Sequence, residues 1–213
     1  MKIVLAGGSG QVGTLLARAF SSEGSEVVVL ARQLPRSERP WRTVLWDGVN
    51  QGEWGQEVDG ADVVVGLGGR SVNCRYNPRN RREILDSRIL STQAVGAAIA
   101  MAVRPPSVWL QMSTATIYAH RFDAPNDERT GVIGGSEPDV PDTWRFSIEV
   151  ATSWELAARE ALVQKTPATR LVLLRSAVVM TSDLGGIFDV LLGLVRRGLG
   201  HAGHDLDATG RPQ

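Results

Sequence analysis

Lys2-Ile3-Val4-Leu5-Ala6-Gly7-Gly8-Ser9-Gly10-Gln11-Val12-Gly13 is the stretch that decides the fold of this 213-residue chain. An apolar strand runs into glycines at positions 7, 10 and 13, and an amphipathic helical pattern follows. Gly7 permits the tight exit from the strand, Gly10 lets a pyrophosphate approach the backbone, and Gly13 lets the helix pack closely on the sheet. The helix N-terminus offers amide donors to phosphates. The stretch therefore predicts a dinucleotide site formed by Gly7, Ser9, Gly10, Gln11, Val12 and Gly13.

Short β-branched apolar runs alternate with longer helical patterns along the chain. The predicted strands are Ile3–Ala6, Val27–Ala31, Thr43–Trp46, Asp62–Gly66, Ser107–Met112 and Leu171–Arg175, and the predicted helices are Val12–Glu23, Pro78–Ala102 and Thr143–Leu162. The strands are almost continuously apolar, as they are when both faces of a parallel sheet are covered. This order predicts an α/β fold with a Rossmann-type, doubly wound, mostly parallel sheet.

We expect a dinucleotide-binding domain in residues 1–180 and only the start of a C-terminal substrate lobe in residues 181–213. A further helix is predicted at Ile187–Arg197 in the second region. Its apolar side chains, among them Phe188 and Leu191, would lie uncovered, and such patches tend to seek a partner. We therefore expect a homo-oligomer. The polar stretch 121–142 is predicted to be a long surface loop.

The composition narrows the classes of partner. Lys and Arg number 23, as do Asp and Glu, so no basic excess predicts nucleic-acid binding. Cys74 is the only cysteine, which excludes an internal disulfide. The glycine turn begins after six residues, too early for a signal peptide, and no apolar run reaches the roughly 18 residues of a membrane span. We expect a cytoplasmic protein with a small-molecule substrate and neither a nucleic-acid nor a membrane partner.

The end of the second predicted strand indicates which dinucleotide is bound. NAD-specific sites place an acidic residue about 20 residues after the turn, where it holds the ribose 2′-hydroxyl. Here Arg32 stands at that point, with Arg36 nearby. A guanidinium forms charge-assisted hydrogen bonds with phosphate. The sequence therefore favours NADP as the cofactor, with NAD as the alternative, while a solvated surface role for Arg32 is the competing interpretation.

Several runs beyond the glycine turn make the chain similar to a known family. They are Trp46-Asp47, Gly66-Leu67-Gly68-Gly69, Arg81–Gln93, Phe146–Glu155, Leu174-Arg175 and Gly185-Gly186. Together they resemble the atypical, extended short-chain dehydrogenase/reductases of the sugar-nucleotide, NAD-dependent epimerase-like kind. The resemblance covers essentially the whole chain. It implies that the family's substrate lobe is largely absent at the C-terminus, either because the chain is a fragment or because it is a naturally shortened member.

The resemblance also implies roles for single cofactor-binding residues. Leu67 and Gly68 would line the ribose region of the cofactor. Asp47 would lie near the adenine, and Arg88 would stand close to the cleft.

The segment after the fifth strand would supply the catalytic hydroxyl of such an enzyme. The resemblance assigns this role to Thr114, with Ser113 as the neighbouring alternative. Tyr118 is a candidate proton donor in place of the usual catalytic tyrosine. The alternative interpretation is that its ring only packs beside the nicotinamide.

The Tyr-x-x-x-Lys pair that short-chain dehydrogenases use for proton transfer is missing. The tyrosine position falls on Phe146 or Ser147 and the lysine position on Val150 or Ala151, and the chain has lysine only at positions 2 and 165. Two functions remain open. The first is an NADP(H)-binding epimerase-like or reductase-like enzyme acting on an unidentified small molecule. The alternative is a non-catalytic NADP(H)-binding sensor or regulatory protein.

The histidines do not predict a metal site. His201 and His204 have i,i+3 spacing, but they stand in a glycine-rich stretch with no third ligand evident. His120 is expected to be a solvent-facing loop residue. We therefore expect no metal.

Overall fold

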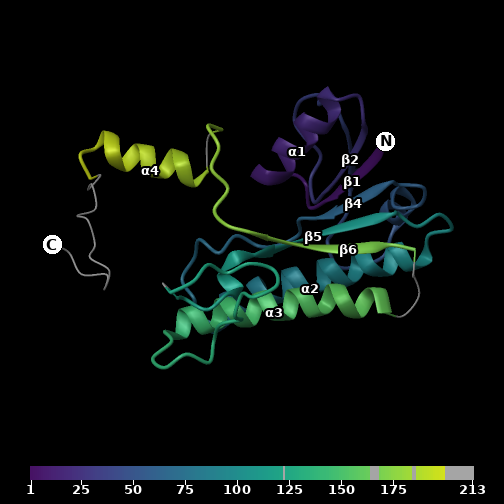
Figure 1. Ribbon diagram of the computed structural model, residues 1–213. Helices are drawn as coiled ribbons and strands as arrows, with labels where there is room; N and C mark the ends of the chain where they lie inside the picture. The colour runs from purple at the N-terminus through teal and green to yellow at the C-terminus, as the bar shows by residue number, and fades with distance from the viewer. Residues whose placement is uncertain (122, 164–167, 184–185, 200–213) are drawn as a thin grey trace. The chain divides into compact units, whose positions relative to one another are not determined.

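The computed structural model (Figure 1) describes residues 1–121, 123–163, 168–183 and 186–199. The chain divides into two compact units, Met1–Ala177 and Val178–Gln213. The first unit contains the sheet, and the second contains α4 (Ile187–Arg196). The predicted domain boundary after residue 180 stays a prediction.

A six-stranded sheet forms the centre of the first unit. Its strands are β1 (Lys2–Ala6), β2 (Glu26–Ala31), β3 (Arg42–Leu45), β4 (Val63–Gly66), β5 (Val108–Thr114) and β6 (Arg170–Ser176). Their order across the sheet is β3-β2-β1-β4-β5-β6, and every neighbouring pair is parallel. The chain changes direction across the sheet between β1 and β4, the kind of switch point where open α/β sheets bind ligands. The predicted α/β, Rossmann-type fold is confirmed.

Helices cover both faces of this sheet. In Figure 1, α1 (Gln11–Ser22) lies on one face, and α2 (Pro78–Met101) and α3 (Asp142–Val163) lie side by side on the other. The side chains of β1 alternate accordingly. Ile3 and Leu5 pack in the cluster with α1, whereas Val4 and Ala6 pack in the cluster with α2. Both faces of the strand are buried, which explains why its sequence is continuously apolar.

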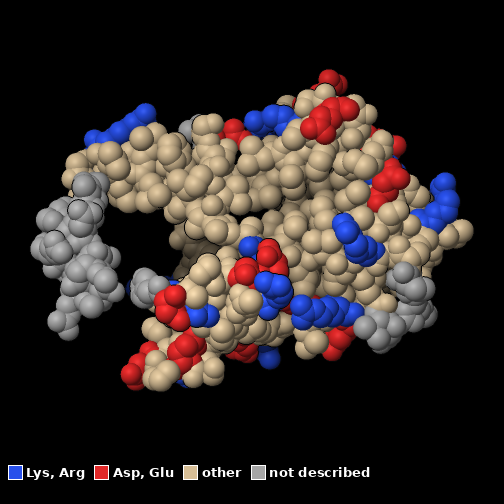
Figure 2. Space-filling view, viewed as in Figure 1, with Lys and Arg blue, Asp and Glu red and all other residues tan. Residues whose placement is uncertain are grey.

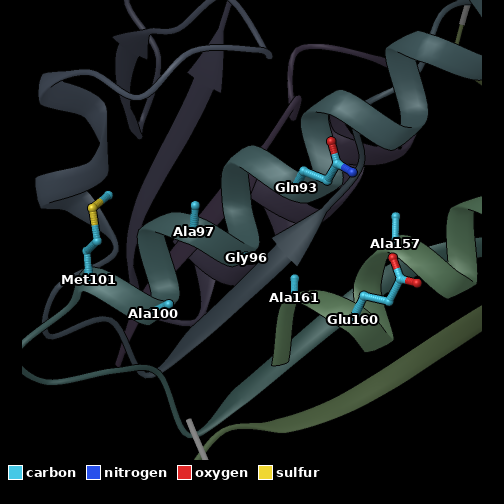
Figure 3. Close-up of a pocket in the computed structure, with 8 residues that line it drawn as sticks. All are labelled: Gln93, Gly96, Ala97, Ala100, Met101, Ala157, Glu160 and Ala161. Carbon is cyan, nitrogen blue, oxygen red and sulfur yellow. The ribbon is translucent and has the colours of Figure 1, made fainter. Parts of the chain in front are cut away.

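A groove between α2 and α3 is lined mainly by glycine and alanine residues, together with Gln93, Met101 and Glu160 (Figure 3). It has a volume of about 390 Å³ and includes Gly96, where a Cβ would lie 2.3 Å from the Cβ of Ala161. All its lining residues belong to the two helices. Gly96 therefore explains their close approach, and the groove takes no part in the site described below.

The observed elements differ from the predicted ones mainly at their ends. The fifth strand was predicted to end at Met112 but continues to Thr114, so both candidate catalytic hydroxyls lie on β5 itself. Two short 3-10 helices, Glu53–Glu57 and Ala115–Ile117, were not predicted. The second begins directly after β5, because Thr114 caps it through a hydrogen bond from the amide of Thr116. This turn sets the direction of the chain after the strand.

Charged side chains of both signs are interspersed over the face of the first unit that Figure 2 shows, with no large region of one sign. In the second unit, α4 ends one residue earlier than predicted, and the expected self-association stays a prediction. No helix within the described ranges is long and apolar enough to cross a membrane.

Candidate functional site

The glycine turn has the close backbone contacts that its sequence predicts. Gly7 has a φ of +79°, and a Cβ there would lie 2.9 Å from the Cα of Gly68 at the end of β4. A Cβ on Gly13 would lie 2.3 Å from the carbonyl oxygen of Gly8. Side chains cannot be accommodated at such distances, so these glycines hold the turn against β4 and α1 against the turn. Gly8, which was not among the predicted cofactor residues, is buried and serves this packing.

The N-terminus of α1 keeps its amide donors available. Gly10 is the N-cap and has no side-chain cap hydrogen bond. The amides of Gln11, Val12 and Gly13 have no partner within the helix, as is general for a first turn. Ser9 and Gly10 are exposed, and a Cβ on Gly10 would meet nothing within 4 Å. The turn therefore combines open space with unused donors, which suits a phosphate group.

Two predicted cofactor residues follow the neighbouring strands β2 and β3. Arg32 is exposed directly after β2, and Arg36 is exposed in the loop that follows. Asp47 accepts hydrogen bonds from the side chain of Asn50 at 2.6 Å and from the backbone amides of Val49 and Asn50 at 2.8 Å each. These bonds, with that of the Asn50 side chain first, lower the pKa of Asp47. Its carboxylate therefore closes a turn, while both arginines face solvent.

The exit of β4 lies against the glycine turn. The amide of Leu67 donates to the carbonyl of Ala6 at 2.8 Å, which continues the pairing of β4 with β1. A Cβ on Gly68 would lie 2.4 Å from the hydroxyl of Ser91 on α2. The backbone at Leu67 and Gly68 is thus confined between the turn and α2, at the switch point of the sheet.

Arg88 extends from α2 to the same exit. Its Nη1 donates to the carbonyls of Arg70, at 3.1 Å, and Ile84, at 3.0 Å. Its guanidinium carbon lies 5.1 Å from the centre of the Trp154 ring on α3. Burial lowers the pKa of Arg88. Arg88 therefore lies against Gly69, which directly follows Leu67 and Gly68 in the chain.

The two candidate hydroxyls at the end of β5 have different surroundings. Ser113 is only 2% exposed, and its hydroxyl donates to Oε1 of Glu155 at 2.7 Å. Thr114 is half-buried, and its hydroxyl lies 2.9 Å from that of Thr116. Because successive side chains of a strand face opposite sides of the sheet, Ser113 faces α3 whereas Thr114 does not. Of the two, Thr114 is the one that keeps contact with solvent.

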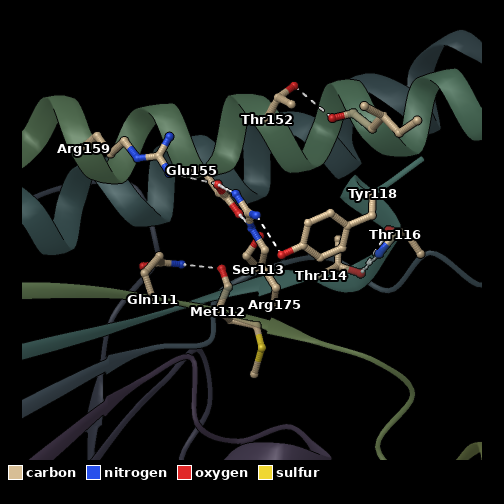
Figure 4. A network of polar contacts seen from close by, with 11 residues as sticks. Gln111, Met112, Ser113, Thr114, Thr116, Tyr118, Thr152, Glu155, Arg159 and Arg175 are labelled. Carbon is tan, nitrogen blue, oxygen red and sulfur yellow. Dashed lines mark hydrogen bonds and ion pairs between the residues drawn. The ribbon is translucent and has the colours of Figure 1, made fainter. Parts of the chain in front are cut away.

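An ion pair between Glu155 and Arg175 joins α3 to β6 in the space between the helix and the sheet (Figure 4). Arg175 donates to both carboxylate oxygens of Glu155, at 2.7 and 2.8 Å, and its Nη1 donates to the hydroxyl of Tyr118 at 2.9 Å. Arg159 adds a second cation, 3.2 Å from the same carboxylate. The Glu155 side chain is 3% exposed. Tyr118, a candidate acid, is therefore part of a network that holds two strands and a helix together.

The pKa of Glu155 is shifted by its neighbours in this network. Burial acts to raise it, but the hydrogen bonds from Arg175 and Ser113 outweigh burial and lower it below its ordinary value of 4.5. The hydrogen bond to Glu155 likewise raises the pKa of Arg175. The two groups stay charged together. Glu155 and Arg175 both belong to the runs that carry the family resemblance. Their contact could not be predicted from the sequence, because a separation of 20 residues does not indicate which side chains meet.

The positions of the missing Tyr-x-x-x-Lys pair lie on the first half of α3. Phe146 and Val150 are each 7% exposed and pack against α2, and Ala151 is fully buried. The hydroxyl of Ser147 donates to the carbonyl of Thr143 at 3.0 Å. None of these side chains carries a phenol or an ammonium group, and none can substitute for the pair.

A metal site has no support among the described residues, where no cluster of three potential ligands occurs. His201 and His204 lie outside the part of the chain that the structure describes. The ring of His120, in the loop before α3, has its centre 6.3 Å from that of the Trp144 ring on α3, and the two ring planes are tilted by 58°.

Comparison with known proteins places this geometry in a family. The model of the NAD dependent epimerase/dehydratase family matches residues 3–138. The bovine epimerase family protein SDR39U1 is 30% identical over 203 residues, which are 94% of this chain and 61% of that protein. The human protein of the same name is 28% identical over 203 residues. The chain thus spans less than two thirds of the length of these curated relatives.

Solved structures show the same likeness. The crystal structure of human epimerase family protein SDR39U1 (isoform 2) with NADPH has a TM-score of 0.76 and 28% identity, with 97% of this chain and 63% of that chain covered. The nucleoside-diphosphate sugar epimerase from Corynebacterium glutamicum has a TM-score of 0.69 and 25% identity, with 96% and 40% covered. The resemblance seen in the sequence is confirmed: the chain belongs to the NAD dependent epimerase/dehydratase family.

Proposed function

We propose that this chain binds NADP(H) at the switch point between β1 and β4. The observation that carries the proposal is the turn itself. Gly7 and Gly13 have no room for a side chain, whereas the space over Gly10 is open and the first amides of α1 are unused. Gly7, Ser9, Gly10, Gln11, Val12 and Gly13 would hold the pyrophosphate. Leu67 and Gly68 would border the ribose beyond it, and Asp47 the adenine end.

NADP is favoured over NAD because of the charge after β2. Arg32 and Arg36 are both exposed there, in reach of the position where a ribose 2′-phosphate would lie, and the described chain places no acid at the end of β2. The NADPH in the human relative's structure supports the same choice.

We infer further that the chain is an epimerase-like or reductase-like protein whose substrate is an unidentified small molecule. NADPH, when bound, supplies a hydride. Thr114 would donate a hydrogen bond to the reacting oxygen, since its hydroxyl is on the solvent-accessible side of β5 while Ser113 is engaged with Glu155. Tyr118 is the alternative acid, and its hydroxyl accepts a hydrogen bond from Arg175, which leaves its own proton free to donate.

A non-catalytic NADP(H) sensor or regulator is the second candidate. It is favoured by the side chains at the Tyr-x-x-x-Lys positions, where Phe146 and Val150 pack in the core between α2 and α3. A protein of this kind would bind the dinucleotide tightly and transfer no hydride.

Two measurements on one preparation test the proposal. Calorimetric titration with NADPH is expected to give saturable binding in the wild type and much weaker binding in Gly10→Asp, whose carboxylate would stand where the pyrophosphate would lie. Nicotinamide absorbance is then followed with carbonyl compounds and sugar nucleotides. Turnover in the wild type that Thr114→Ala reduces supports the enzyme, and binding without turnover supports the sensor. Absence of NADPH binding to the wild type would contradict both.

A further inference from the structure

Arg88 is a partly buried cation whose charge no carboxylate balances among the described residues. Its pKa is lowered by burial, and the acids that neutralise Arg42, Arg81 and Arg175 have no counterpart here. Its only described hydrogen bonds come from Nη1 and go to two neutral backbone carbonyls. A buried charge without a counter-charge costs free energy, so such a residue usually has a partner.

The remaining donors of this guanidinium are available to a ligand. Nε and Nη2 of Arg88 donate to no described residue, and neither is among the buried nitrogen and oxygen atoms that lack a partner, so both reach solvent. The group is held in place by its neighbours. The centre of the Trp154 ring lies 5.1 Å from its Cζ, and a Cβ on Gly69 would lie 3.2 Å from the same atom. A fixed guanidinium with free donors matches the two oxygens of a carboxylate or a phosphate.

The position of Arg88 separates it from the anionic groups of the cofactor. In the sheet, β2 lies on one side of β1 and β4, whereas β5 lies on the other. The pyrophosphate would lie at the N-terminus of α1 and the 2′-phosphate at Arg32, after β2. Arg88 instead lies between Gly69, after β4, and Trp154 on α3, which packs against β5. With the cofactor placed in this way, we expect both charged groups of NADP(H) to lie away from Arg88, on the β2 side of the site.

We propose that Arg88 binds an oxyanion, a carboxylate or a phosphate, of the substrate. This inference rests on the proposed function, because it places the substrate on the β5 side of a bound dinucleotide. It names the substrate class as anionic. The resemblance grouped Arg88 with the cofactor residues, but its place beside Trp154 favours the substrate.

The test uses the whole chain saturated with NADPH, at constant ionic strength set with chloride. Malonate and inorganic phosphate serve as the carboxylate and phosphate probes, and malonamide serves as the uncharged control. Binding is followed by calorimetry and by the indole N–H signal of Trp154 in nitrogen-correlated NMR spectra, assigned with Trp154→Phe. We expect one of the two anions to bind saturably and to shift this signal, and malonamide to do neither.

Matched variants locate the binding. Arg88→Gln is expected to weaken the bound anion by about tenfold or more, since hydrogen bonds to charged groups contribute that much. Arg88→Lys keeps the charge but loses the planar pair of donors, and should be intermediate. Arg82→Gln, at an exposed arginine on the same helix, should change the affinity by less than about twofold.

The outcomes separate this inference from the proposed function. The inference is wrong if NADPH binds but the wild type shows no anion-dependent shift of the Trp154 signal. It is also wrong if Arg88→Gln binds the anion as tightly as the wild type. In either case Arg88 has only a structural role, in which it joins the loop after β4 to α2. The Trp154 signal is read on the wild-type protein, so it remains informative if a variant fails to fold. If NADPH itself does not bind, the proposed function fails first, and the same anion titration without NADPH still decides the role of Arg88.

Discussion

The turn after β1 and the junction of β5, β6 and α3 differ in whether their polar groups have hydrogen-bond partners. At the turn, the first amides of α1 have no cap and the space over Gly10 is open. At the junction, the groups of Ser113, Glu155, Tyr118 and Arg175 bind one another. The first arrangement leaves donors for a ligand, and the second uses them to hold the fold. We therefore expect changes at the turn to affect ligand binding and changes at the junction to affect stability.

Glu155→Gln should produce the largest loss of stability. It removes one member of a buried ion pair and leaves Arg175 unbalanced, which typically costs about 3 kcal/mol in the free energy of unfolding. NADPH affinity should not change, because the turn lies elsewhere. Urea denaturation and calorimetry measure the two effects. Glu160→Gln, at an exposed position on the same helix, is the control and should leave both quantities unchanged. A loss of NADPH affinity in Glu155→Gln would show that the two regions are coupled.

The same ion pair sets a pH dependence. The pKa of Glu155 is lower in the folded chain than its ordinary value of 4.5, so its contribution to stability is fully present above about that pH. The contribution is lost as the pH falls through the folded pKa. The stability difference between the wild type and Glu155→Gln should therefore narrow as the pH is lowered below 4.5, and a constant difference down to the acid transition would contradict the assignment.

Gly10→Asp changes the glycine turn and should affect NADPH affinity rather than stability. The new carboxylate has room in the fold, since nothing lies within 4 Å of a Cβ there, but it meets the phosphates of the ligand. NADPH affinity should fall by about 100-fold or more, which corresponds to about 2.7 kcal/mol. Gly10→Ala, which adds only a methyl group, should lose less affinity, and both variants should unfold at the wild-type urea concentration. Wild-type affinity in Gly10→Asp would place the dinucleotide elsewhere.

Arg32→Ala tests whether the site distinguishes NADPH from NADH. The variant removes charge-assisted hydrogen bonds to a 2′-phosphate, so NADPH should bind about tenfold more weakly. NADH, which lacks that phosphate, should bind as it does to the wild type. Calorimetry with both nucleotides gives the comparison, and equal losses for the two would mean that Arg32 acts on something other than the phosphate.

Ser113→Ala and Thr114→Ala should give the smallest effects. The first should affect the free energy of unfolding, and the second should affect turnover. Ser113→Ala removes a buried hydrogen bond to a carboxylate and should lower the free energy of unfolding by about 1 to 2 kcal/mol, with NADPH affinity unchanged. Thr114→Ala should lower turnover, if a substrate is found, more than it lowers stability. The reverse pattern would assign the catalytic hydroxyl to Ser113.

Much of the fold was predictable because its signals are local. Apolar runs located the strands, and Gly7, Gly10 and Gly13 indicated the tight turn between the first strand and the first helix. The resemblance assigned the catalytic hydroxyl to Thr114 with Ser113 as the alternative, but the surroundings of the two side chains were not predictable, because they depend on which face of β5 each occupies and on where β5 ends. The pairing of Glu155 with Arg175 and the burial of Arg88 depend on the packing of α2 and α3, which sequence spacing does not encode.

One measurement tests the central claim most directly: calorimetric titration of the wild-type chain with NADPH and with NADH under identical conditions. Binding at residues 7–13, with Arg32 at the 2′-phosphate, predicts saturable one-to-one binding of NADPH that is tighter than that of NADH by about tenfold or more. Equal affinity for the two nucleotides would contradict recognition of the 2′-phosphate. No binding of either would contradict the assignment of the turn as a dinucleotide site.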